Sequence, residues 1–85
     1  INFHFLGELL MPKVPVVKAE KLIKVLRKNG FIHFRTKGSH QIFVNKEKKI
    51  SVSVPVHKGR DLGRGIALAI LKDAEISLDE FLRNL

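Results

Sequence analysis

The strongest constraint on the fold is a pair of strand-like runs separated by a very short connection. Residues 31–36 and 40–45 are rich in aromatic and β-branched side chains, which favour strands. Gly38 and Ser39 lie between them, and a glycine supplies the positive φ that the first central residue of a type II′ turn requires. The pattern therefore predicts a β-hairpin whose second strand begins at His40.

A third strand is predicted by the most regular alternation in the chain, at residues 50–54. Ile50, Val52 and Val54 share one face there, and serines occupy the other. Pro55 has no amide hydrogen to donate to a ladder, so it ends the strand or marks a sheet edge. One face of the sheet is thus expected to be buried.

The alternation within residues 40–45 places Phe43 on the opposite side from Ile42 and Val44. We therefore expect Phe43 to be partly exposed. An exposed ring there is suited to stacking on a base or meeting a partner protein, and burial under the N-terminal residues or in a dimer contact fits the pattern equally well.

Helical periodicity flanks the three strands. A first helix is predicted from residue 19, with apolar residues on one stripe, and Asn29 and Gly30 supply its stop. After an exit loop at residues 57–60, Asp61 is the expected N-cap of a second helix. Its expected core stripe comprises Leu62, Ile66, Ala69, Ile70 and Leu71. The spacing of Ser77 and Glu80 fits a capping box, which predicts a short last helix to about residue 84.

The predicted order is α-β-β-β-α with a further short helix, an α+β fold in which a three-stranded antiparallel sheet has helices on one face. With 85 residues the chain can form one compact domain with a modest core. Residues 1–10 show no clear period or cap, so we interpret them as an extension outside the core and residues 11–85 as a single domain. The strand and helix order is that of double-stranded RNA-binding domains.

The charge favours a polyanionic partner. The chain has 16 Lys and Arg against 8 Asp and Glu, a formal net charge of +8, and residues 13–49 alone carry eleven bases against two acids. The bases on the polar surface of the first helix are Lys18, Lys21, Lys24, Arg27 and Lys28. Together they suit phosphate contacts, although solvation explains any single one of them.

Several other classes are excluded by composition. The chain contains no Cys, which excludes disulfides, thiolate nucleophiles and Cys-based metal sites. No apolar run approaches the roughly 20 residues of a membrane span, and the N-terminus lacks the basic region of a secretory signal. We therefore expect a cytoplasmic protein with no membrane partner and no small-molecule cofactor.

Three local patterns give the chain a resemblance to the HicA toxins of bacterial and archaeal toxin-antitoxin pairs, over residues 18–85. They are Asn29-Gly30-Phe31, Lys37-Gly38-Ser39-His40 and Val54-Pro55-Val56-His57. The second is the most specific, because family members carry Gly-Ser-His at this point of the topology, and the resemblance implies that His40 is catalytic. It also implies a type II toxin-antitoxin system, in which the toxin is a metal-independent endoribonuclease acting on mRNA and a HicB-like antitoxin covers the His40 surface.

Such cleavage needs a group that takes the proton of the 2′-hydroxyl, so that this oxygen can attack the adjacent phosphorus and expel the 5′-oxygen. Imidazole suits this task at neutral pH, so His40 is the predicted general base. The residues expected to bind the substrate around it are Lys37, Gly38, Ser39, His57, Lys58 and Arg60. Ser39 is not expected to be a nucleophile activated by His40, because adjacent residues of an extended chain point to opposite faces.

Two points stay open from the sequence alone. The chain could instead be a non-catalytic module of the double-stranded-RNA-binding type, in which His40 only donates a hydrogen bond, or a protein-interaction domain for an acidic partner. His57 fits a general acid or phosphate ligand and equally a simple loop residue. A metal site is not expected, since His40 and His57 lack a third and fourth ligand.

Overall fold

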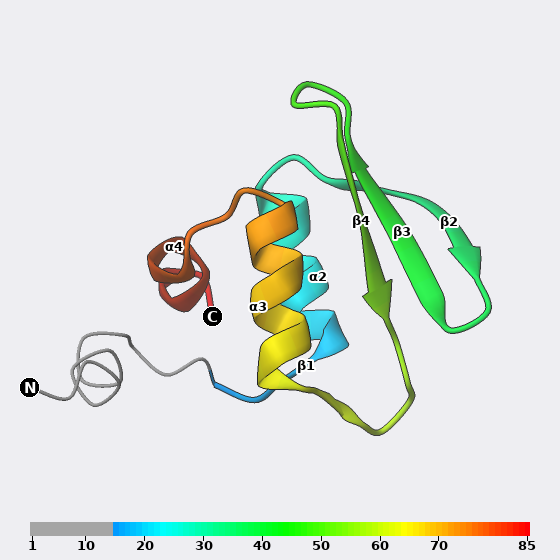
Figure 1. The fold of residues 1–85 in the computed structure, drawn as a ribbon, viewed down its shortest axis with the longest axis vertical. Helices are drawn as coiled ribbons and strands as arrows, with labels where there is room; N and C mark the ends of the chain where they lie inside the picture. Colours follow the sequence, from blue (N-terminus) through cyan, green and yellow to red (C-terminus); the bar gives the residue numbers. More distant parts are fainter. Residues whose placement is uncertain (1–14) are drawn as a thin grey trace, which may run out of the picture.

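A computed structural model describes residues 15–85, so the expected extension at residues 1–10 lies outside the described part. The elements in chain order are β1 (Val17–Lys18), α2 (Ala19–Lys28), β2 (Ile32–Lys37), β3 (His40–Asn45), β4 (Ile50–Pro55), β5 (Asp61–Leu62), α3 (Arg64–Asp73) and α4 (Leu78–Arg83). Figure 1 shows this course. The predicted α+β class and the order of one helix, three strands and two helices are confirmed. None of the described helices has the length and apolar composition to cross a bilayer.

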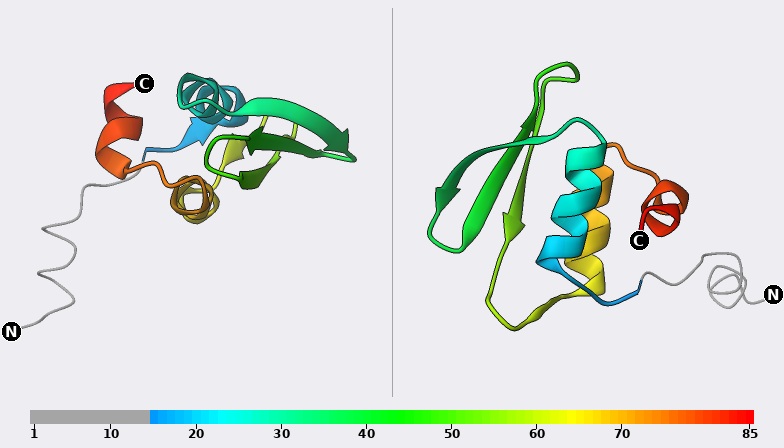
Figure 2. Two further views of the ribbon diagram at one scale, coloured as in Figure 1. Left: turned by 90° about the horizontal axis from the view of Figure 1, so that it is seen from above. Right: turned by 180° about the vertical axis from the view of Figure 1, so that it is seen from behind.

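The sheet is antiparallel with strand order β2-β3-β4. Helices α2 and α3 pack side by side against one of its faces, and α4 lies beyond them on the side away from the sheet (Figure 2). No described helix covers the opposite face. We call this open side the outer face; β3 and β4 contribute to it His40, Ile42, Val44, Ser51, Ser53 and Pro55.

The expectation that Phe43 is partly exposed is wrong. Phe43 pairs with Val52 across β3 and β4, lies on the helix side with it, and has 0 % of its surface exposed. Ile42 and Val44, which are only half-buried, lie on the outer face instead. The reason is the register between β3 and β4. Directly opposed residues share a face of the sheet, and the apolar face of β4 packs against the helices.

The core lies between the helices and the sheet. Its fully buried large side chains are Phe31, Phe43, Phe81, Leu22, Leu26, Leu71, Val25 and Val54. In α3 the predicted stripe is only partly correct, because Ile66 and Ala69 are exposed while Ala67 and Ala74 are buried beside Ile70. Residues 66–71 are apolar all round, so periodicity alone does not select the side that packs.

Two short strands, β1 and β5, were not predicted. Because β5 occupies residues 61–62, the second long helix begins later than predicted, at Arg64. β1 pairs with β5, and Lys18 Nζ lies 3.3 Å from Asp61 Oδ1. Asp61 is therefore a strand residue paired with Lys18, and its predicted role as N-cap is wrong. The N-cap of α3 is Gly63, which makes no side-chain cap bond.

The first and second long helices end in the same way. After α2, Gly30 has a φ of 87°, and the amide of Phe31 donates to Leu26 O at 3.1 Å. This is a Schellman closure, and it confirms the predicted stop. After α3, the amide of Ile76 donates to Leu71 O at 2.9 Å, but the left-handed position is held by Glu75, with a φ of 58°. A non-glycine residue thus occupies a position that favours glycine.

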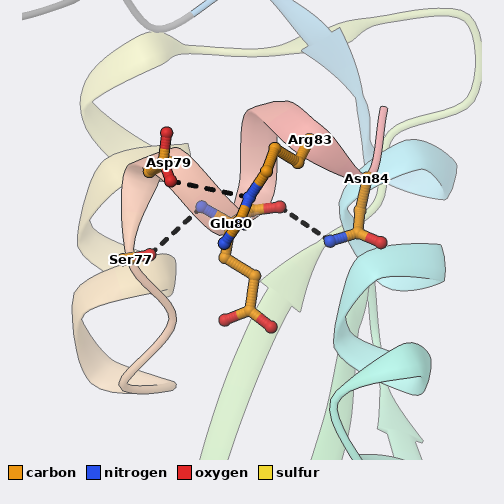
Figure 3. A network of polar contacts seen from close by, with 5 residues as sticks. All are labelled: Ser77, Asp79, Glu80, Arg83 and Asn84. Carbon is orange, nitrogen blue, oxygen red and sulfur yellow. Dashed lines mark hydrogen bonds and ion pairs between the residues drawn. The ribbon is translucent and has the colours of Figure 1, made fainter.

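The last helix begins at the predicted cap. Ser77 Oγ accepts from the Glu80 amide at 3.1 Å, and the side-chain amide of Asn84 donates to Glu80 O at 2.8 Å (Figure 3). Asp79 and Arg83 form an exposed ion pair of 3.5 Å on the same turn. The return bond of the capping box, from the Glu80 carboxylate to the Ser77 amide, is not formed in the described structure.

One buried polar residue ties the sheet to α2. Asn45, at the end of β3, has 4 % of its surface exposed. Its Nδ2 donates to Asn29 O at 3.1 Å, and its Oδ1 accepts from the Lys48 amide at 3.0 Å. The side chain therefore closes the turn between β3 and β4 and holds it against the end of α2.

Candidate active site

The site is built on the turn between β2 and β3. Lys37 and His40 are directly opposed, so two residues connect the strands. Gly38 has a φ of 59°, whereas Ser39 has no positive φ, as the predicted type II′ turn requires. A Cβ added at Gly38 would meet no atom within 4 Å, so the backbone there is open to a ligand.

His40 begins β3, and its side chain is exposed on the outer face. Its Nδ1 lies 3.2 Å from Ser53 Oγ, on the neighbouring strand. Ser53 is opposed to Ile42, two positions along β3 from His40, so the contact is diagonal across the ladder. The bond engages Nδ1, and Nε2 has no hydrogen-bond partner among residues 15–85.

Ser53 was missed by the sequence reasoning. Its position on the outer face follows from the alternation of residues 50–54, but its place beside His40 depends on the register between two strands. Serines are also common on solvated strand faces, so the residue type carried no signal of its own.

The exit loop comes close to the hairpin turn. The Val56 amide donates to Ser39 O at 2.7 Å, which extends the ladder one step beyond Pro55 and brings the next residue, His57, beside the turn. The loop then turns at Lys58 and Gly59, where the Arg60 amide donates to His57 O at 3.0 Å.

The predicted substrate-binding residues thus lie on two adjacent loops. The side chains of Lys37, His57, Lys58 and Arg60 are exposed and make no hydrogen bond or ion pair within residues 15–85. Within this described range, these side chains have no partner that a ligand would have to displace. Lys58 and Arg60 precede β5, so they do not adjoin the first amides of α3, because that helix begins only at Arg64.

The site is electropositive. Residues 31–60 carry seven Lys and Arg and a single acid, Glu47, in the turn between β3 and β4. Arg35 and Lys37 share the outer face with His40, because they are opposed to Ile42 and His40 themselves. A phosphodiester on this surface therefore meets cations and no carboxylate from the sheet.

His33 belongs to a different surface. It is opposed to Phe43 on the helix side, with the two rings 5.5 Å apart in an edge-to-face arrangement, and its Nε2 lies 2.9 Å from Thr36 Oγ1. Arg27 of α2 lies 6.0 Å from the centre of the Phe43 ring. His33 therefore has packing and hydrogen-bonding partners, as expected of a structural histidine.

His40 lines neither of two open hollows on the surface of residues 15–85. An open groove of about 340 Å³ runs along α2 and is lined by Glu20, Ile23, Lys24, Arg27, Gln41 and Val56. Lys24 and Arg27 belong to the basic surface predicted for the first helix, but none of the six is a residue predicted to bind the substrate around His40. A second hollow, of about 510 Å³, lies near β1 and β5. We place the candidate site on the outer face because the exposed imidazole and its neighbouring cations are there. In residues 15–85 no three His, Asp or Glu side chains form a group able to hold a metal ion.

These features define an α+β protein of the double-stranded-RNA-binding-domain type that carries an exposed histidine on the open face of a basic sheet. A family model described as the HicA toxin of bacterial toxin-antitoxin systems matches residues 19–76, which include α2, the whole sheet and α3. The chain therefore belongs to the HicA toxin family. Members of this family are known as RNases, and a toxin-antitoxin family implies an antitoxin partner. A search of the curated proteins finds no match to the chain.

Proposed function

We propose that this toxin is an endoribonuclease that cleaves mRNA without a metal ion, with His40 as the general base. The observation that carries the proposal is the exposed His40 ring, oriented by Ser53 and facing Lys37 across the ladder. The Gly-Ser-His pattern at this turn supports the same assignment.

In the tautomer that acts as a base, Nδ1 of His40 carries hydrogen and donates to Ser53 Oγ, and Nε2 presents its lone pair. Nε2 takes the proton of the 2′-hydroxyl as the 2′-oxygen bonds to phosphorus. The bond from phosphorus to the 5′-oxygen breaks, and this oxygen gains a proton to leave as a hydroxyl. The products are a 2′,3′-cyclic phosphate and a 5′-hydroxyl end.

His57 is our candidate donor of the proton to the leaving oxygen. The bond between Val56 and Ser39 sets it beside the hairpin turn, and its side chain has no competing hydrogen bond in the described structure. In-line displacement requires the general acid to act on the opposite side of the phosphorus from the base.

The cations of the two loops are proposed to bind and stabilise the phosphate. Lys37, Lys58 and Arg60 supply the charge, and the open backbone at Gly38 and Ser39 lets amide groups approach the phosphate oxygens. A HicB-like antitoxin that covers the outer face would exclude RNA from the same residues.

The direct test is cleavage of a labelled single-stranded RNA in the presence of a chelator. We expect the His40→Ala variant to lose about 10²- to 10⁴-fold in rate, the usual contribution of a general base. His33→Ala is the matched control, because it removes an exposed histidine from the helix side of the same sheet. The RNA should end in a 2′,3′-cyclic phosphate, and a 2′-deoxy substitution at the cleaved position should block the reaction.

Cleavage that survives His40→Ala, or that requires a divalent metal, would refute the mechanism. Binding of RNA without cleavage by the wild-type protein would favour the non-catalytic module instead.

A further inference from the structure

The edge strand β2 contains an irregularity beside the candidate site. His33 is opposed to Phe43 and Arg35 to Ile42, so one step along β3 corresponds to two steps along β2. Phe34 is the extra residue. This is a β-bulge, in which Phe34 and Arg35 together oppose Ile42, a residue of the outer face.

The bulge decides which side chains of β2 share a face with His40. Strict alternation from Ile32, which opposes Val44 on the outer face, would turn Arg35 and Lys37 toward the helices. Because Phe34 is inserted, both cations reach the outer face instead. Bulges are enriched next to active sites, where they redirect a side chain.

Phe34 itself is the most exposed large apolar residue of the described structure, with 65 % of its surface accessible. Two cations follow it on β2: Arg35 is the next residue, and Lys37 lies three residues on, at about 10 Å along the strand. That length corresponds to about three stacked nucleotides at roughly 3.4 Å each.

We propose that Phe34 is a stacking platform for an unpaired base of the RNA, close to the phosphate at His40. This inference rests on the proposed function and names its substrate class, which is RNA that is single-stranded at the site. Aromatic side chains flanked by cations bind single strands by stacking on the bases while the cations follow the phosphates. The bases of a duplex are already stacked on one another and offer no face to the ring.

Charge complementarity selects RNA as the occupant. The strands β2, β3 and β4 contain no acid, and two cations, Arg35 and Lys37, follow Phe34 on β2. The other large apolar side chains that are exposed in residues 15–85 are aliphatic and offer no aromatic face for a base; they are Val16, Ile32, Ile66, Leu68 and Leu85.

The test measures binding without cleavage, so that it does not depend on the catalytic role of His40. The full chain is titrated against a short 2′-O-methyl RNA containing 2-aminopurine, whose fluorescence is quenched by stacking, and anisotropy gives the Kd. Phe34→Ala is compared with Phe34→Tyr, which keeps the aromatic face, and with Ile32→Ala, which removes a neighbouring exposed apolar side chain.

We expect Phe34→Ala to weaken binding of the single strand about 5- to 100-fold and to abolish the quenching, as expected for loss of one base stack. Phe34→Tyr and Ile32→Ala should stay within about twofold of wild type, and binding of a duplex of the same sequence should be unchanged in all variants. Wild-type affinity and quenching in Phe34→Ala would overturn the inference. So would a loss confined to binding of a protein partner, which would assign the ring to that interface.

Discussion

Replacing Ser53 by alanine tests whether the hydrogen bond that orients the His40 ring contributes to the rate, because the variant keeps His40 itself. The change removes the hydroxyl that lies 3.2 Å from His40 Nδ1 and leaves the backbone ladder intact. Ser53 is exposed, so the free energy of unfolding should change by less than about 0.5 kcal/mol. A single hydrogen bond contributes about 0.5 to 1.5 kcal/mol, and this is the part of the transition-state stabilisation that the variant should lose.

That loss corresponds to a kcat lower by about 2- to 12-fold, since each 1.36 kcal/mol is tenfold in rate. The KM should be unchanged, because Ser53 holds the base and is not proposed to touch the RNA. Ser53→Thr retains a hydroxyl on the same strand face and should restore most of the rate. Nitrogen NMR of the imidazole should show hydrogen mainly on Nδ1 in the wild type and a mixture of tautomers in Ser53→Ala.

The assay is single-turnover cleavage of the labelled RNA beside the NMR measurement. A Ser53→Ala variant with wild-type kcat and an unchanged tautomer would refute the reasoning. A Ser53→Thr variant as slow as Ser53→Ala would show that the effect does not pass through the hydroxyl.

Two further predictions concern stability, measured by urea unfolding. Asn45→Ala removes the two hydrogen bonds that join the Asn45 side chain to Asn29 and to Lys48. At about 1 kcal/mol each, their loss should lower the free energy of unfolding by about 2 kcal/mol. The control Ser51→Ala, at an exposed position, should change it by less than about 0.5 kcal/mol, and equal effects of the two variants would contradict this. Glu75→Gly relieves the left-handed backbone at φ 58° and should raise the free energy of unfolding by up to about 1 kcal/mol, while an unchanged or lower value would show that the strain is offset by other contacts.

Much of the fold was predictable because local chemistry specifies it. The stop at Gly30 and the turn at Gly38 depend on positive φ values that glycine adopts without steric cost. The cap at Ser77 depends on a hydroxyl that accepts a hydrogen bond from the backbone amide three residues later, that of Glu80. In each case the groups that determine the structure lie within a few residues of one another, so the local sequence is enough to predict it.

The candidate site was predictable in part. The position of His40 at a hairpin turn follows from local patterning, and its catalytic assignment follows from the family resemblance. The partner of its ring, Ser53, is 13 residues away and is chosen by the register of β3 and β4. The prediction for Phe43 was wrong for the same reason, since only pairing with Val52 shows which face of β3 is buried.

By itself, the sequence determined the class of fold, the hairpin at Gly38, the helix ends and the basic character of the surface, because these depend on residue type and short spacing. The tertiary structure alone decided the pairing of Lys18 with Asp61, the bulge at Phe34 and the faces on which Arg35 and Lys37 lie. Such features depend on how distant segments dock, and a shift of one residue in strand register reverses every face. The geometry around His40 is therefore a property of the assembled sheet.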